Sequence, residues 1–346
     1  MRQVKNIMDL WEMSRVDSKR SGRGRLEIIQ DAIMCRKRYN CSINDYLAFG
    51  FSMLDKKYRE DYLTVHMNYL TSKQINDMRY ENKWLAYQAL SEFFKRDVIH
   101  LIESSDEEVQ AFMGKYQSFF AKEPDSFGGK GVKFIEQGEY EGLNGMALAE
   151  ALREKGLYVL EEPLVQHEAL NCFNPSSVNT LRIITITNKK LESIFLPFVL
   201  RVGASASKVD NVRSGGYYTL LDNEGKVALD GYYQESYQND ELIVKKHPVT
   251  GLEPLGFQIP YFQESIEMIE EMARRVPQVP IVGWDICITP DGPALVEFNA
   301  FPSIDFNQNY YFTDILGVES LGAKKRIEEH LNLRIKLEPG FPVEWL

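Results

Sequence analysis

The sequence has little of what marks membrane-spanning, secreted or disulfide-rich proteins. Its longest clean apolar stretch, 194–200, is far shorter than the ~20 residues of a membrane-spanning helix. Asp9 and Glu12 interrupt the N-terminal segment, which therefore lacks the apolar core of a signal peptide. No CxxC pair occurs, so scattered reduced thiols are expected at Cys35, Cys41, Cys172 and Cys287. These absences predict a cytoplasmic protein without an integral membrane segment.

An excess of basic residues is also missing. Lys and Arg number 40 against 50 Asp and Glu, which gives a net charge of −10. Such a chain is a poor polyanion binder, so we expect no nucleic-acid partner, although a local cationic pocket can still bind a small phosphate ligand. An early basic cluster is most simply a solvated segment, with a lipid-phosphate or glycan-phosphate contact as the alternative. It comprises Arg15, Lys19, Arg20, Arg23 and Arg25.

The motifs of several enzyme classes are absent. The five histidines show no H-E-x-x-H spacing and no serine lies in a G-x-S-x-G elbow, so nucleophilic Ser or Cys catalysis has no support. The dinucleotide fingerprint G-x-G-x-x-G does not occur. A Walker loop is excluded where glycines do cluster, because Gly131 and not Ser or Thr follows Lys130.

The pattern of elements predicts an α+β chain. Its 346 residues exceed the ~250–300 that one core usually holds, so we expect more than one subdomain. Apolar periodicity predicts a helical N-terminal region over 1–80, a smaller mixed subdomain over 81–160 and a larger one over 161–346. Helices are expected at 82–94, 147–155, after Pro260 and at 319–331. Strands are expected at 117–121 and 157–160, and hairpins at 181–187 with 193–202 and at 217–221 with 226–229.

An acidic hairpin near the C-terminus is the most informative segment. Pro290–Gly292 fits a three-residue loop, which would pair Asp285 with Glu297 and place Asn299 on the same face. Paired strands hold opposed Cβ atoms ~4.5–5.5 Å apart, where two carboxylates repel unless a cation separates them or one is protonated. Three hard oxygen donors suit Mg²⁺. The alternative is a solvated acidic hairpin.

Cationic residues lie on other segments. A predicted strand ends at Lys122, and the loop Asp125–Gly131 follows it with glycines that let the backbone approach phosphate oxygens. The alternative is a flexible hairpin tip. Three arginines lie on or beside the central hairpins, where they either pair with an acidic partner or bind phosphate or carboxylate in a bidentate manner. They are Arg182, Arg201 and Arg213.

In this order, these features resemble the ATP-grasp superfamily. The closest likeness is to the sugar-transfer-associated ATP-grasp family, which is related to α-L-glutamate ligases. The likeness covers about 40–335 and includes the phrases 175–182 (PSSVNTLR), 209–211 (VDN), 247–251 (HPVTG), 281–285 (IVGWD) and 297–299 (EFN). It implies an ATP-grasp fold, in which two α+β subdomains grip ATP between them, here preceded by the helical N-terminal region.

The resemblance also implies roles for individual residues. Lys83 and Lys122 would hold the α- and β-phosphates, and Gly128, Gly129, Lys130 and Gly131 would form the flap over the triphosphate. Glu161, Glu162 and Leu164 would form the adenine hinge, although no lysine stands where some relatives have one. His167 or Glu168 would reach the ribose. Asp285, Glu297 and Asn299 would hold one or two Mg²⁺, and Arg182, Arg201 and Arg213, with Asn211, would stabilise the γ-phosphate and an acyl phosphate.

The implied activity is that of an ATP-dependent carboxylate–amine ligase that forms an amide through an acyl phosphate. Its partners would be a small-molecule carboxylate and an amine, and the family's association with sugar transfer suggests a cell-surface glycan precursor in polysaccharide biosynthesis. One alternative is a kinase of the same fold that phosphorylates a hydroxyl, with Asp210 as the candidate base. The other is a non-catalytic nucleotide-binding module.

Overall fold

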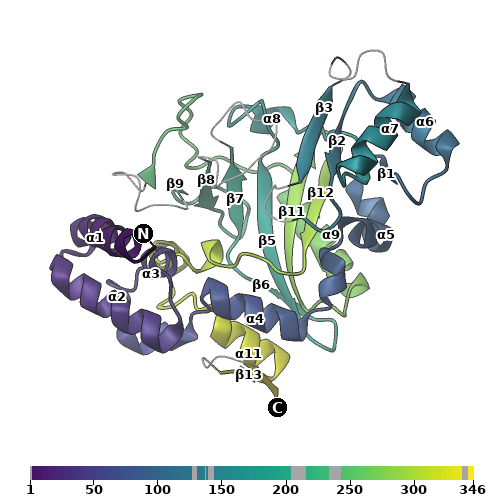
Figure 1. Ribbon diagram of the computed structural model, residues 1–346. Helices are drawn as coiled ribbons and strands as arrows, with labels where there is room; N and C mark the ends of the chain where they lie inside the picture. Colours follow the sequence, from purple (N-terminus) through teal and green to yellow (C-terminus); the bar gives the residue numbers. More distant parts are fainter. Residues whose placement is uncertain are drawn as a thin grey trace.

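The computed structural model describes residues 2–126, 131–136, 138, 144–203, 216–233, 243–336 and 342–346. The chain begins with the expected helices (Figure 1). They are α1 (Arg2–Ser21), α2 (Arg25–Tyr39), α3 (Ile43–Ala48) and α4 (Val65–Ile75), with the 3₁₀ turns η1 (Lys56–Asp61) and η2 (Met78–Glu81). None of the helices in the described part of the chain is long and apolar enough to cross a membrane.

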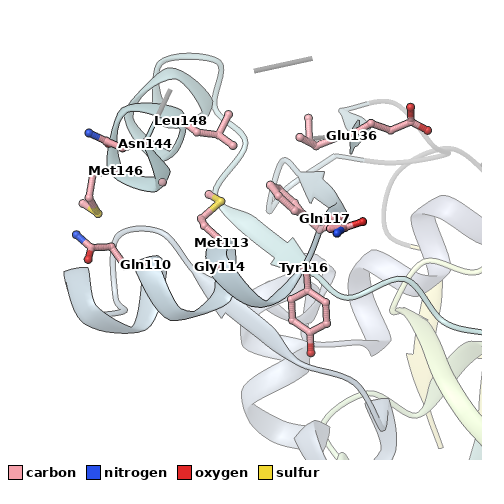
Figure 2. Close-up of a pocket in the computed structure, with 12 residues that line it drawn as sticks. Gln110, Met113, Gly114, Tyr116, Gln117, Glu136, Asn144, Met146 and Leu148 are labelled. Carbon is pink, nitrogen blue, oxygen red and sulfur yellow. The ribbon is translucent and has the colours of Figure 1, made fainter. Parts of the chain in front are cut away.

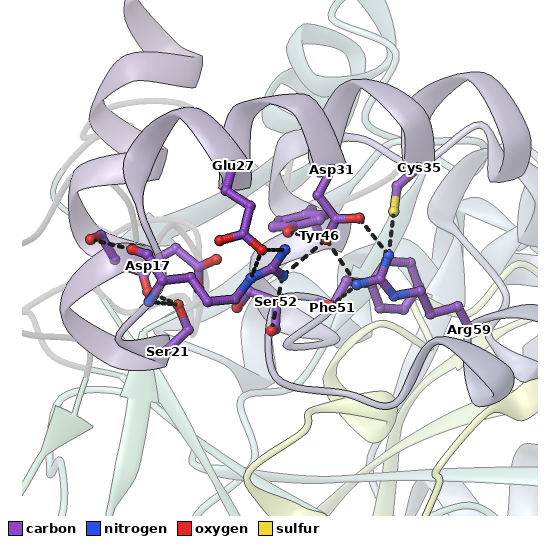
Figure 3. Close-up of polar contacts among 11 residues, drawn as sticks. Asp17, Ser21, Glu27, Asp31, Cys35, Tyr46, Phe51, Ser52 and Arg59 are labelled. Carbon is purple, nitrogen blue, oxygen red and sulfur yellow. Dashed lines mark hydrogen bonds and ion pairs between the residues drawn. The ribbon is translucent and has the colours of Figure 1, made fainter.

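A buried ion network holds the N-terminal helices together (Figure 3). Asp31 of α2 accepts hydrogen bonds from both terminal nitrogens of Arg59, each at 2.8 Å, and from the Tyr46 hydroxyl at 2.8 Å. Arg23, just before α2, also reaches Asp31 at 3.2 Å. Burial alone would raise the pKa of Asp31, but its hydrogen bonds to Arg59 and Tyr46 lower that pKa to about 2. The network ties α2, α3 and η1 into one unit.

A small antiparallel sheet has the strand order β1-β4-β2-β3. Its strands are β1 (Val98–His100), β2 (Ser118–Lys122), β3 (Val132–Glu136) and β4 (Val159–Glu161). Helices α6 (Asp106–Lys115) and α7 (Gly145–Glu154) pack together beside it (Figure 1). Apolar residues of both helices and of three strands share one core, which includes Val109, Leu152 and Phe119. We call this sheet with its two helices the small lobe.

A second sheet of eight strands forms the large lobe. Its strand order is β10-β9-β8-β7-β5-β11-β12, and β6 pairs with β5 beside this path. The strands are β5 (Thr180–Thr187), β6 (Ser193–Phe195), β7 (Val199–Val202), β8 (Tyr217–Leu220), β9 (Gly231–Tyr233), β10 (Ile243–Val244), β11 (Ile281–Thr289) and β12 (Gly292–Asn299). Strand β11 pairs antiparallel with β5, which is distant in sequence, and with β12, which follows β11 through a tight turn and forms one edge of the sheet.

Helices cover both faces of the large sheet. On one face, α5 (Lys83–Phe94) and α9 (Phe262–Arg275) pack on β12 and share a core with Trp284 and Ile286. On the other face, α4 and α11 (Ala323–Leu331) bury the far ends of β5 and β11. The short elements α8 (Glu168–Asn171), η6 (Phe306–Gln308), α10 (Phe312–Leu316), β13 (Leu333–Ile335) and β14 (Val343–Trp345) complete the described part of the chain.

The α+β class is confirmed, and three element predictions need correction. The run 193–202 is two strands, β6 and β7, with Pro197 in the gap between them. The run 226–229 turns back as expected, with an antiparallel bridge between Leu221 and Val227 and a hydrogen bond from the Ala228 N–H to the Leu220 carbonyl, but it forms no strand, and β8 pairs with β7 and β9. The last helix begins at Ala323 and not at 319. Its N-cap, Gly322, lies so close to Asp61 that a Cβ there would come within 2.3 Å of the Asp61 backbone, so a side chain at this position would clash.

Candidate functional site

The acidic hairpin has the predicted pairing but not the predicted turn. Asp285 of β11 lies opposite Glu297 of β12, as expected. The turn is shorter than predicted, since Thr289 pairs with Gly292. A bulge then shifts the register beyond Ile286, which pairs with Leu295, so Val296 is the extra residue of β12. The bulge adds the one residue that the shorter turn removes, which restores the predicted pair.

Two arginines converge on Asp285. Arg182 of β5 pairs across the sheet with Asp285 and donates from Nε to Oδ1 at 2.6 Å and from Nη2 to Oδ2 at 2.9 Å. Arg201 of β7 donates from Nη1 to both oxygens at 3.2 Å. Burial alone would raise the pKa of Asp285, but the two guanidinium groups outweigh it and hold the pKa below its usual value. In this state both arginines therefore have an acidic partner.

Glu297 faces a lysine from α5. Its carboxylate lies 3.9 Å from Nζ of Lys83, and its side chain is 37% exposed, whereas the residue Asp285 is only 3% exposed. Glu81 at the end of η2 is close enough to interact electrostatically with both groups. Burial raises the pKa of Glu81 to about 7, against a hydrogen bond from the Phe301 N–H and with a further contribution from Glu297. The site thus contains two neighbouring carboxylates, Glu81 and Glu297, of which Glu297 is open to solvent.

Lys83 also anchors the start of the predicted flap loop. Its backbone N–H donates to the Pro124 carbonyl at 2.9 Å, and its Nζ donates to the Ser126 carbonyl. Burial lowers the pKa of Lys83, and neighbouring Glu297 opposes that shift. The positive charge of Lys122 also lowers the pKa of Lys83, so the two lysines that are predicted to bind phosphate lie within electrostatic range of each other.

Lys122 is held by a buried triad in the small lobe. Its Nζ lies 2.7 Å from Oε2 of Glu161, and the same oxygen accepts from Nε and Nη2 of Arg96 at 3.1 and 2.5 Å. Burial would raise the pKa of Glu161, but Arg96 and Lys122 lower it to about 2. Glu161 is therefore ionised and fully compensated at neutral pH.

The remaining hinge and ribose residues follow β4. The Glu162 N–H donates to the Asp97 carbonyl at 2.9 Å, so this N–H is already hydrogen-bonded next to the pairing of β1 with β4. Leu164 is half-buried. Nδ1 of His167 accepts the Ala169 N–H at 3.1 Å and caps α8, while Glu168 is exposed at the first position of that helix.

Several predicted site residues cannot be located. Gly128, Gly129, Lys130, Asn211 and Arg213 lie outside the described residues, as does the candidate base Asp210. Gly131 is described and has a φ of +66°, a left-handed conformation in which glycine is strongly favoured.

The donor set fits a Mg²⁺ ion in part. Glu297 is accessible, and Asn299 supplies a neutral oxygen on the same face, its Nδ2 donating to the Gly283 carbonyl at 3.3 Å. Asp285 is buried and already neutralised by arginines, so it would join only by sharing its oxygens with them. No group of three or more His, Cys, Asp or Glu suited to a metal occurs among the described residues.

A separate pocket of about 480 Å³ lies on the small lobe between α6, α7 and β3 (Figure 2). Its polar lining includes Gln110, Gln117, Glu136 and Asn144. None of its lining residues is basic and none belongs to the predicted site, so we do not assign phosphate binding to it.

Sequence reasoning missed the residues that support this site through backbone groups. Asn76 donates from Nδ2 to the carbonyls of Ile281 and Ala300 at 2.7 and 2.5 Å, and it accepts the Ile281 N–H at 3.0 Å. Arg96 donates to the carbonyls of Leu295 and Val296 at 2.5 and 3.0 Å. No local motif marks such residues, because their partners lie about 200 positions away in the chain.

The chain belongs to the sugar-transfer associated ATP-grasp family, whose model matches residues 67–313. No curated protein matches it. Among solved structures, it is similar to an ADP complex of N5-carboxyaminoimidazole ribonucleotide synthetase, with 12% identity, a TM-score of 0.37, and coverage of 69% of this chain and 52% of that one. For the ATP-grasp ligase PsnB with a phosphomimetic precursor variant, Mg and ADP, the values are 12%, 0.40, 71% and 57%. For D-alanyl-alanine synthetase A from Vibrio cholerae they are 14%, 0.36, 68% and 63%.

The chain thus spans between about half and under two thirds of the length of these proteins. The family assignment rests on the sequence match. The described residues of the candidate site, from Lys83 to Asn299, all lie within the matched range.

Proposed function

We propose that the protein is an ATP-dependent carboxylate–amine ligase that forms an amide through an acyl phosphate. The observation that carries this proposal is the pair of arginines at Asp285, opposite the accessible Glu297. Lys83 from α5 and Lys122 from the small lobe supply positive charge to the same region. Fixed cations around an accessible carboxylate suit a reaction in which phosphate charge moves from a nucleotide to an acceptor.

The lysines, the metal-binding residues and the arginines have different roles in this reaction. Lys83 and Lys122 bind the phosphates, and Mg²⁺ held by Glu297 and Asn299 would neutralise their negative charge. Arg182 and Arg201 stabilise the acyl phosphate, since rigid guanidinium forks match planar and tetrahedral oxyanions in a bidentate manner. The amine then attacks the acyl carbon, the C–N bond forms, and inorganic phosphate leaves. Asn211, Arg213 and the flap are assigned by the resemblance alone.

The family's link to sugar transfer supports a proposal for the substrate class. We infer that the acid or the amine is carried on a glycan precursor, or is a sugar acid or amino acid destined for one.

A hydroxylamine trap tests the reaction. Purified full-length protein is incubated with ATP, Mg²⁺, hydroxylamine and one acid from a panel of uronic acids, amino acids and dicarboxylates, without a second substrate that could act as the amine. We expect a hydroxamate together with ADP for the correct acid. A stable phosphate ester with no hydroxamate would instead establish a kinase, and a panel that includes sugar alcohols provides its acceptors. Nucleotide binding without turnover of any acceptor would favour the non-catalytic module.

A further inference from the structure

Arg96 is a buried cation that the proposed reaction does not use. It lies just before β1, its side chain is 3% exposed, and it bridges the two lobes. On one side it donates to Glu161 at the end of β4, and on the other to the carbonyls of Leu295 and Val296 in β12. Its guanidinium also lies over the Phe94 ring, 4.9 Å from the centroid.

The hydrogen bond from Arg96 to Val296 supplies a donor to a carbonyl at the bulge of the acidic hairpin. Val296 is the residue that the register shift leaves without a partner on β11. A carbonyl that leaves a ladder needs another donor when it is buried. Arg96 supplies that donor at 3.0 Å, one residue before Glu297.

The ion pair between Arg96 and Glu161 bears on whether the Lys122 side chain can leave Glu161. Arg96 and Lys122 share a single oxygen of Glu161, but their anchorage differs. Arg96 has two further hydrogen bonds to β12, whereas the described contact of the Lys122 ammonium is Glu161 alone, and the Lys122 side chain is 12% exposed. Lys122 also has a flexible stem, while the Arg96 fork is planar and fixed. Arg96 is thus the permanent partner of Glu161, and Lys122 is the exchangeable one.

We propose that Arg96 is a positioning residue that compensates Glu161 so that Lys122 can leave it for a nucleotide phosphate. This inference rests on the proposed function, in which Lys122 binds phosphate. A buried carboxylate that loses its only cation is strongly disfavoured. Without Arg96, Glu161 would therefore retain Lys122, and the nucleotide would lose a phosphate contact. With Arg96 present, the exchange leaves no buried charge unpaired.

Binding of Mg-ADP to the full-length protein tests this, measured by titration calorimetry for four variants. Arg96→Met should weaken binding by about tenfold or more, the loss of one charge-assisted contact. Adding Glu161→Gln to Arg96→Met should restore affinity to within about threefold, because the neutral amide no longer retains the lysine. Rescue by a second substitution is a result that a purely structural role of Arg96 does not produce. An Arg96→Met loss that Glu161→Gln leaves uncorrected, or no loss at all, overturns the proposal.

Two single variants complete the test. Lys122→Met separates this inference from the proposed function. Unchanged Mg-ADP affinity in this variant would overturn both the phosphate contact of Lys122 in the proposed function and the role of Arg96 that depends on it. A loss in Lys122→Met without a loss in Arg96→Met overturns only the role of Arg96. Glu161→Gln alone is the reference for the double variant, because Glu161 itself lies in the predicted adenine hinge. If Arg96→Met does not fold, Arg96→Gln replaces it, since the amide keeps a donor for the carbonyls of β12 and removes only the charge. The same loss and the same rescue are expected, and the absence of either overturns the proposal.

Discussion

At the scale of single residues, the site separates two carboxylates that pair on adjacent strands. Asp285 is buried and bound by two guanidinium groups, whereas Glu297 is partly exposed and only loosely approached by Lys83. Repulsion between them is relieved by the arginines on one side and the lysine on the other. This asymmetry gives them different roles: Asp285 holds the arginines in place, and Glu297 is the carboxylate available to a ligand.

Replacement of Glu297 by Gln should lower turnover by orders of magnitude with little loss of stability. The substitution removes the accessible charge that a Mg²⁺ ion needs, while a partly exposed side chain with one distant ion-pair partner contributes about 1 kcal/mol or less to folding. ATP turnover and urea unfolding measure the two effects. Asp291→Asn in the exposed turn of the same hairpin is the matched control and should change neither. Near-normal turnover in Glu297→Gln would remove Glu297 from the metal site.

At the scale of elements, sequence reasoning worked where the signal was local. Strand alternation placed Asp285 and Glu297 on one face, and the helices expected at 82–94 and after Pro260 are present as α5 and α9. It failed on the turn of the hairpin, because Pro290-Asp291-Gly292 is compatible with loops of two or three residues. The bulge at Val296 left no signal either, since the Arg96 side chain that bonds its carbonyl reaches β12 only through tertiary packing.

Helix α4 supports the site through Asn76, which bonds the backbone at the start of β11 and just beyond β12. Asn76→Ala should lower the free energy of unfolding by about 3 kcal/mol, because it leaves buried backbone groups of Ile281 and Ala300 without partners. Urea unfolding gives this value. Gln30→Ala, an exposed position on α2, serves as the control and should fall within about 0.5 kcal/mol of the unmodified protein. A similarly small effect at Asn76 would mean that water replaces its hydrogen bonds.

The N-terminal helices should be sensitive to acid through Asp31. Its pKa of about 2 in the folded protein lies below its ordinary value of 3.8. The ionised carboxylate therefore contributes stability above pH ~4 that is lost as the pH falls toward 2, by about 2 kcal/mol in total. Urea unfolding of Asp31→Asn across this range should lack that part of the pH dependence and start from lower stability at neutral pH. Asp314→Asn, at an exposed position, should keep the full dependence; an unchanged profile in Asp31→Asn would assign the acid sensitivity to other carboxylates.

At the scale of the whole molecule, the candidate site joins parts that are distant in sequence. Lys122 and Glu161 come from the small sheet, Lys83 from a helix on the large sheet, and Glu297 from that sheet's edge strand. Arg96 connects the lobes directly at this point. The family resemblance predicted a set of candidate residues, but it could not predict the ion pairs that hold Lys122, Arg182 and Arg201 in the structure.

A ligand bound at this junction should stabilise both lobes together. Mg-ADP at about 100 times its Kd adds about 2.7 kcal/mol to the free energy of unfolding, which for a chain of this size raises Tm by roughly 4 °C. Because the site draws residues from both sheets, calorimetry should show one transition that shifts as a whole. Glu297→Gln should shift less with Mg-ADP than the unmodified protein, while ADP without Mg²⁺ should act equally on both. A transition that splits, with only the small-lobe part moving, would place the nucleotide on the small sheet alone and leave the carboxylate hairpin outside the site.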